Sequence, residues 1–159
     1  MSFPENWVRG FVRQWVAGRM KTGGAGAKGI GAVEALENRR GLFVDEDVVS
    51  AIRTLEVEKW IYLRDLRHHS VLLYPDGFIA FGVVGLTQPL RNLTGGPGFL
   101  LEAGIMAIEG HFICDGLLGE VVALGPGYQA DYTPLYKELK AIGAFHKVPK
   151  PGFLRRPRE

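Results

Sequence analysis

A turn sequence between two uncharged stretches constrains the fold more than any other feature of this chain. Pro75 presets φ, Asp76 can bond within its own turn, and Gly77 accepts a positive φ. β-Forming residues flank the turn on both sides. The pattern predicts a β-hairpin with arms at residues 71–74 and 78–86.

Neither arm of this hairpin holds a charged side chain, so both of its faces are predicted to be apolar. Successive side chains of a strand point to opposite faces, and each apolar face must be shielded from water. Helices can shield one face. The other face needs a second layer, a closed barrel interior or a partner subunit. We expect Phe78, Phe81 and Val83 to contribute to an interface between subunits.

Helical patterns precede the hairpin. Apolar residues recur at helical spacing in residues 5–20, a second helix is predicted over residues 29–39, and a third opens at Asp45. Residues 59–66 alternate instead between polar and apolar side chains, as in a strand with one wet face. The period therefore changes from helix to strand near residue 58.

The predicted fold class is α+β. A mainly antiparallel sheet of five or six strands occupies about residues 58–124, with three helices before it and one after it. The last helix is predicted to begin at Asp131 or Thr133, with Pro134 in its first turn, and to end at Gly143.

Glycine supplies 22 of the 159 residues, about twice the usual share of ~7%. Four glycines in the second half of the sheet segment fall six residues apart, at positions 98, 104, 110 and 116. This period is compatible with one coil of a left-handed β-solenoid. The alternative is a β-meander in which Glu109-Gly110 and Asp115-Gly116 form tight turns.

The net charge of +2 conceals two basic ends. Residues 1–40 carry seven basic and three acidic side chains, residues 41–145 carry seven and thirteen, and residues 146–159 carry five and one. We predict a single domain over residues 1–145, followed by a basic, proline-containing tail over residues 146–159.

Several classes of protein are excluded by composition. No apolar stretch approaches the ~20 residues of a membrane span, and charged side chains occupy the positions where a signal peptide carries its apolar segment. A single cysteine, Cys114, cannot form a disulfide within the chain. We therefore expect a cytoplasmic protein in a reducing environment, with no cofactor and no metal.

A glycine-rich segment at residues 24–29 matches the Gly-x-Gly-x-x-Gly pattern of phosphate-binding loops. It makes Gly26, Lys28 and Gly29 candidate ligand-binding residues. The dinucleotide form of this motif follows a strand, whereas a helix is predicted before it here. The alternative is a linker that caps a helix.

The densest group of chemically capable residues is His111 with Asp115 and Glu102, which we consider as a general acid-base set. An imidazole titrates near neutrality, and a carboxylate can fix its tautomer. On an extended strand Cys114 faces away from His111, which disfavours a Cys-His nucleophile pair. The alternative is an edge-strand histidine, a turn aspartate and a buried thiol.

His68 and His69 are adjacent, so on a strand their side chains point to opposite faces and do not reach one metal ion. Arg64 and Arg67 nearby also disfavour a bound cation. A solvated strand end beside a turn is the alternative that we favour.

These observations support three hypotheses of function. The first is a non-catalytic homo-oligomeric domain, a dimer, that binds a partner protein or a small apolar ligand. The second is a small enzyme that uses His111 with Asp115 or Glu102. The third, which we do not expect to be the main activity, is weak nucleic-acid binding through the basic termini.

Overall fold

The computed structural model describes residues 46–150. The chain divides into two compact units, Met1–Glu56 and Val57–Glu159. Helix α3 (Glu46–Arg53) belongs to the first unit and agrees with the helix predicted to open at Asp45. The helices predicted over residues 5–20 and 29–39 lie outside the described residues.

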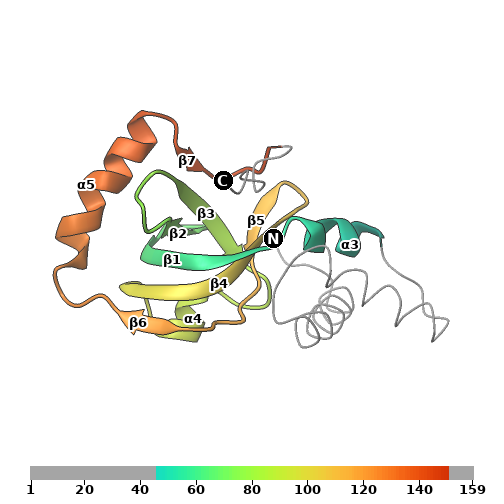
Figure 1. Ribbon diagram of the computed structural model, residues 1–159, viewed down its shortest axis with the longest axis horizontal. Coiled ribbons are helices and arrows are strands. Elements are labelled where there is room, and N and C mark those ends of the chain that lie inside the picture. The colour runs from blue at the N-terminus through green and yellow to red at the C-terminus, as the bar shows by residue number, and fades with distance from the viewer. Residues whose placement is uncertain (1–45, 151–159) are drawn as a thin grey trace. The chain divides into compact units, whose positions relative to one another are not determined.

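The second unit is built mainly from strands (Figure 1). In chain order its elements are β1 (Glu56–Asp65), β2 (Ser70–Leu73), β3 (Ala80–Gly85), α4 (Leu90–Thr94), β4 (Phe99–Ile108), β5 (His111–Cys114), β6 (Val121–Ala123), α5 (Tyr128–Ala141) and β7 (Phe145–His146). Among the described residues, no helix has the length and apolar character needed to cross a bilayer.

The strands form one mixed sheet that closes into a barrel. Neighbouring strands follow the order β1-β2-β3-β5-β4-β6, and an additional pairing of β1 with β4 closes the barrel. Strand β3 runs parallel to both β5 and β7, whereas its pairing with β2 is antiparallel. The α+β class is confirmed. The sheet differs from the prediction in having seven strands and parallel pairs.

The predicted hairpin is confirmed as β2 and β3, which pair antiparallel from Ser70 opposite Val83 to Leu73 opposite Ala80. The Asp76 carboxylate accepts a hydrogen bond of 3.0 Å from the backbone N–H of Phe78. Gly77 has a φ of 76°, as the turn requires.

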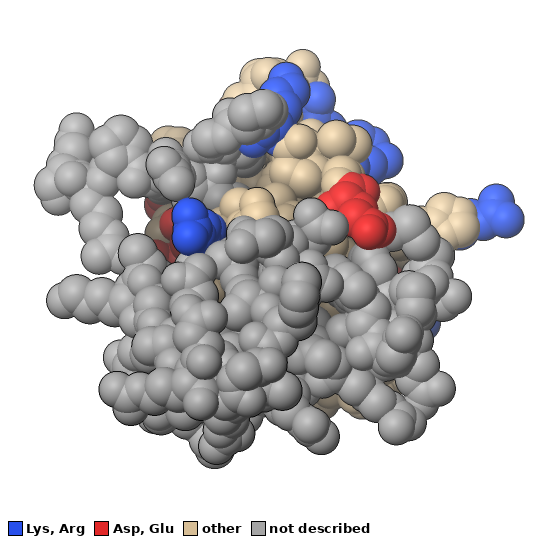
Figure 2. Space-filling model, turned by 90° about the vertical axis from the view of Figure 1, so that its right-hand side faces the viewer, with Lys and Arg blue, Asp and Glu red and all other residues tan. Residues whose placement is uncertain are grey.

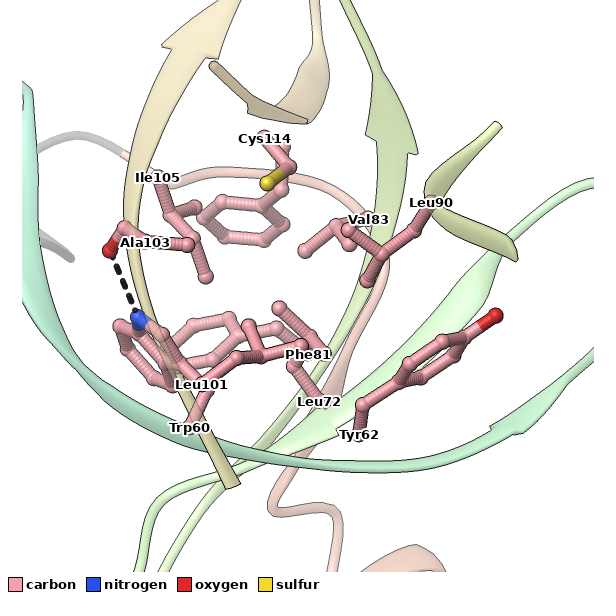
Figure 3. Close-up of a cluster of buried hydrophobic side chains, with 11 residues drawn as sticks. Trp60, Tyr62, Leu72, Phe81, Val83, Leu90, Leu101, Ala103, Ile105 and Cys114 are labelled. Atoms are coloured by element: carbon pink, nitrogen blue, oxygen red, sulfur yellow. Dashed lines mark hydrogen bonds between the residues drawn. The ribbon is translucent and has the colours of Figure 1, made fainter. Parts of the chain in front are cut away.

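One apolar face of this hairpin lines the interior of the barrel. Figure 3 shows the interior side chains converging from all five barrel strands and from α4. They are Trp60, Tyr62, Leu72, Phe81, Val83, Leu90, Leu101, Ala103, Ile105, Phe112 and Cys114. These side chains fill the barrel, so its centre is a packed core.

The other face of the hairpin is covered by α5 and β7. Tyr136 and Leu139 of α5 pack with Val71, Leu73 and Ala80 on the outside of the barrel. Both faces are thus covered within a single chain, and the hairpin alone gives no reason to invoke a partner subunit.

Of the two alternatives for the six-residue glycine period, the structure confirms the tight turn at Glu109 and Gly110, because β4 and β5 form an antiparallel hairpin around these residues. Both turn residues have positive φ, which is the geometry of a tight two-residue turn. The short helix α4 lies in the segment between β3 and β4, and its Leu90 is buried in the barrel core.

The last helix begins earlier than predicted, at Tyr128, so Pro134 lies inside it. The additional turns bring Tyr128 and Tyr132 against the outer apolar cluster, and this burial favours helix formation before the proline. His146, predicted as the first residue of a tail, lies in β7 and pairs with Phe81.

Candidate functional site

A candidate site lies on the outer face of β3, around Gly82. A Cβ atom at Gly82 would lie 3.2 Å from Cγ of Lys147, 3.4 Å from the ring of Phe145 and 3.5 Å from Cβ of His69. The absence of a side chain at Gly82 therefore allows the β1–β2 turn and the segment of β7 to approach each other over β3.

Three of the four histidines of the chain lie around this face. His68 and His111 are close enough to His69 for their charges to act on it. His146 lies on the opposite face of the sheet, where its ring is 6.2 Å from the ring of Phe81. His69 and His111 come from separate segments of the chain, and the fold brings them together.

Fixed positive charges accompany the histidines. Arg67 lies in the same turn as His68, Lys147 acts on His69, and Lys150 acts on His146. The side chain of Lys147 also lies over the ring of Phe145, 5.6 Å from its centroid. We refer to five of these residues as the β3 cationic face: Arg67, His68, His69, His111 and Lys147.

The β3 cationic face does not follow from the overall composition. Residues 57–150 carry eight Lys and Arg against nine Asp and Glu. Within the described residues, none of Arg67, Lys147 and Lys150 forms an ion pair with a carboxylate. In Figure 2, Lys and Arg side chains gather at the top of the view, the level at which both β7 and the C-terminal end of α5 lie in Figure 1.

A buried polar network holds the β1–β2 turn that carries Arg67, His68 and His69. The hydroxyl groups of Tyr62 and Ser70 both donate to one carboxylate oxygen of Asp65, at 2.6 and 2.8 Å. Within the turn, the N–H of Leu66 donates to the carbonyl of His69 at 2.7 Å. The base of the turn is thus fixed, while Arg67 and His68 stay exposed.

The surroundings of His69 oppose its protonation. Burial lowers the pKa of His69, and the nearby Lys147, His111 and His68 lower it further. Burial and Lys150 lower the pKa of His146 on the other face. The groups that lower the pKa of His69 among the described residues are cations or other histidines, and a surface of like charges favours binding of an anion.

The structure does not bring His111, Asp115 and Glu102 together. His111 and Asp115 lie at opposite ends of β5, and four residues of a strand span roughly 13 Å. The Asp115 carboxylate accepts a hydrogen bond of 2.9 Å from the N–H of Leu117. Glu102 lies on β4, where its N–H donates to the carbonyl of Glu120.

Cys114 is buried in the barrel core, and burial raises the pKa of its thiol to about 12. A thiol in this state is neutral and behaves as a small apolar group. Within residues 46–150, no group of three His, Cys, Asp or Glu side chains is arranged to hold a metal ion.

Two groups of residues predicted from the sequence remain, the ligand-binding and the interface residues. Gly26, Lys28 and Gly29 lie outside the described residues. Phe81 and Val83, expected at a subunit interface, point into the barrel core, whereas Phe78 is 74% exposed.

The β3 cationic face is missed by reasoning from the sequence, in which His68 and His69 are considered only as possible metal ligands. One signal for it is present in the sequence, namely basic residues beside histidines in two distant segments.

Comparison of the chain with protein-family models, curated proteins and solved structures gives no match.

Proposed function

We propose that the barrel unit is a non-catalytic module that binds nucleic acid through its phosphates, with the β3 cationic face as the binding surface. The observation that carries this proposal is the gathering of His68, His69 and His111 with Arg67 and Lys147, two cations that form no ion pair with a carboxylate among the described residues. The third hypothesis from the sequence placed nucleic-acid binding at the basic termini, whereas the present proposal places it on the β3 cationic face.

The distribution of the charges favours a ligand with several negative groups. The cations belong to the β1–β2 turn, to β5 and to the segment beginning at β7, so one small anion does not reach them all. A nucleic acid carries a phosphate at every nucleotide, and contacts to these phosphates supply most of the affinity in non-specific binding.

Two features support binding over catalysis. The proposed acid-base residues His111 and Asp115 are separated along β5, and the Cys114 thiol is buried in the core. The barrel interior is packed with side chains, which also leaves the small apolar ligand of the first hypothesis without support there.

Charge reversal on the proposed surface tests this function. We expect the double variant Arg67→Glu/Lys147→Glu to weaken binding of a labelled single-stranded oligonucleotide at least about 10-fold at roughly 50 mM salt. The slope of log K against log salt should also become shallower, by about 0.7 for each phosphate that the variant no longer neutralises. Fluorescence anisotropy at several salt concentrations measures both quantities.

A matched control separates this surface from net charge. Lys137→Glu/Lys140→Glu makes the same change in charge on exposed positions of α5. We expect it to retain affinity within about 3-fold. Equal losses of affinity in the two double variants, or no binding by the unmodified protein, would contradict the proposed surface.

Self-association is a second candidate function, favoured by the edge strand β6. Val121 and Val122 are each 43% exposed, and β4 is the only strand paired with β6 among the described residues. The N–H of Leu124 donates to the carbonyl of Gly98, and the carbonyl of Glu120 accepts from the N–H of Glu102, so Val121 and Ala123 between them turn their backbone groups outward. Glu120 is ion-paired with Lys59 at 2.6 Å, which removes like-charge repulsion between two such edges.

We propose that a second copy pairs antiparallel with β6, and light scattering after gel filtration tests this pairing. We expect Val121→Lys to shift a dimer toward monomer, because a lysine on an edge strand disfavours pairing. Ile142→Lys changes an exposed apolar residue elsewhere and should leave the mass unchanged. If Phe78→Lys alone dissociates the dimer, the interface lies at the hairpin turn instead.

A further inference from the structure

We propose that Arg91 of α4 extends the nucleic-acid site around the end of the barrel, where it exchanges its partner Asp65 for a phosphate of the ligand. This inference rests on the proposed function. It adds Arg91 as a binding residue and Asp65 as the positioning residue that holds it before the ligand arrives. Neither residue is part of the β3 cationic face.

The β1–β2 turn connects Arg91 to the β3 cationic face. At the base of this turn, Nε of Arg91 lies 3.3 Å from a carboxylate oxygen of Asp65. Arg67 and His68 lie exposed in the same turn. A nucleic-acid strand that passes over the turn therefore meets cationic side chains from the turn and from α4.

Helix α4 holds the backbone of Arg91 at the barrel. Leu90, the residue before it, is 2% exposed and packs in the barrel core. The N–H of Gly95 donates to the carbonyl of Arg91 at 2.8 Å and closes the helix. The side chain of Arg91 is nevertheless 60% exposed. A guanidinium on a fixed backbone loses less conformational freedom on binding than one on a mobile segment.

The contact between Arg91 and Asp65 is geometrically incomplete. The Oδ2 atom of Asp65 is buried and accepts no hydrogen bond from the described residues, although Nε of Arg91 lies nearby. The Oδ1 atom accepts from the hydroxyl groups of Tyr62 and Ser70, at 2.6 and 2.8 Å. Asp65 therefore keeps two hydrogen bonds when Arg91 turns away from it.

These contacts favour exchange when a phosphate is close. An ion pair with an exposed arginine adds little to stability, so little is lost when Arg91 leaves Asp65. A phosphate offers the planar guanidinium two oxygens at once, and such charge-assisted, bidentate contacts are stronger than a single misaligned one. The exchange also releases a condensed counterion from the nucleic acid.

A phosphate within a polymer has an advantage over free phosphate at this position. A strand bound at Arg67 and His68 brings its next phosphates close to Arg91, which raises their effective concentration there. Inorganic phosphate has no such tether. We therefore expect it to compete much more weakly than an unlabelled oligonucleotide at the same concentration of phosphate groups.

Removal of the Arg91 charge tests the added contact. We expect Arg91→Gln to weaken binding of a labelled thymidine oligonucleotide about 3–10-fold at roughly 50 mM salt, and to make the salt slope shallower by about 0.7. Arg91→Lys should recover part of this loss. Lys137→Gln removes an exposed charge on α5 and should stay within about 2-fold. Fluorescence anisotropy at several salt concentrations measures both quantities.

Asp65→Asn tests the exchange of partners. The amide keeps an oxygen for the hydroxyl groups of Tyr62 and Ser70 but removes the charge that faces Arg91. We expect binding to tighten about 3-fold, whereas loss of a merely structural contact would weaken it. Glu138→Gln makes the same change in net charge on α5 and should alter affinity less than about 1.5-fold. Circular dichroism verifies folding.

The outcomes distinguish this inference from the proposed function. Absence of oligonucleotide binding by the unmodified protein overturns both. Equal affinities of Arg91→Gln and Lys137→Gln, beside a loss in Arg67→Glu/Lys147→Glu, overturn the role of Arg91 and leave the proposed function standing. This comparison holds even if Asp65→Asn does not fold.

Two further results would overturn the exchange itself. The first is a tightening by Asp65→Asn that persists in full when Arg91 is already Gln, because Asp65 would then act on the phosphate directly. The second is competition by inorganic phosphate as strong as that by the unlabelled oligonucleotide, because Arg91 would then belong to a site for a free anion.

Discussion

Trp60→Ala is expected to lower the free energy of unfolding by about 3–5 kcal/mol, the range for removing a large buried aromatic side chain. Trp60 is 1% exposed in the barrel core. Its ring makes edge-to-face contacts with Tyr74 and Phe81, with centroids 5.4 and 5.6 Å apart. Urea denaturation followed by circular dichroism measures the change in stability.

The position of Trp60 adds a specific consequence. Its indole N–H donates to the carbonyl of Ala103 at 3.0 Å, which joins β1 to β4 at the seam that closes the barrel (Figure 3). Trp60→Phe keeps an aromatic ring but leaves this carbonyl without its donor, and we expect it to cost about 1–3 kcal/mol. A decrease in stability below about 1 kcal/mol in Trp60→Ala would contradict the role of this residue in the core.

The hairpin of β2 and β3 was predictable because its signals are local. Pro75, Asp76 and Gly77 specify the turn within three residues, and the flanking β-forming residues extend it into strands. The turn at Glu109 and Gly110 was also recognised as one of two alternatives. In both places, short-range backbone preferences and the hydrophobic pattern favour the same structure.

Closure of the barrel was not predictable because it depends on contacts between distant segments. The pairing of β1 with β4 joins residues about forty positions apart, and the parallel pairing of β3 with β5 crosses α4 and β4. Hydrophobic periodicity shows that a face is buried, but it does not specify its partner. The prediction therefore left a second layer, a barrel and a partner subunit open.

The same limit applied to the candidate site. The sequence showed His68 and His69 as a pair and Lys147 as part of a tail, with no signal that the two segments would meet beside Gly82. The grouping depends on Gly82, where a missing side chain allows two segments to approach. Such a contact is evident only once the strand register is known.

Gly85→Ala is the second substitution for which a large decrease in stability is expected. A Cβ atom at Gly85 would lie 1.8 Å from the carbonyl oxygen of Gln88 and 2.8 Å from its carbonyl carbon. Both are backbone atoms, so a rotation of a flexible side chain does not relieve the clash. The turn after β3 must move instead.

That movement would disturb the junction between β3, β5 and α4. Gly85 lies opposite Cys114 in the parallel pairing, and the N–H of Leu86 donates to the carbonyl of Cys114 at 3.0 Å. The turn also precedes Leu90, which is buried in the barrel core. We expect the free energy of unfolding to fall by about 3 kcal/mol, at the upper end of the usual cost of overpacking.

Gly127→Ala provides the matched glycine control. Gly127 has a φ of −85°, and a Cβ atom there would meet nothing within 4 Å. Because alanine adopts this backbone conformation without strain, we expect a change within about 1 kcal/mol. Comparable urea midpoints for the two variants would show that the turn after β3 yields readily, and the close approach at Gly85 would then not constrain the barrel.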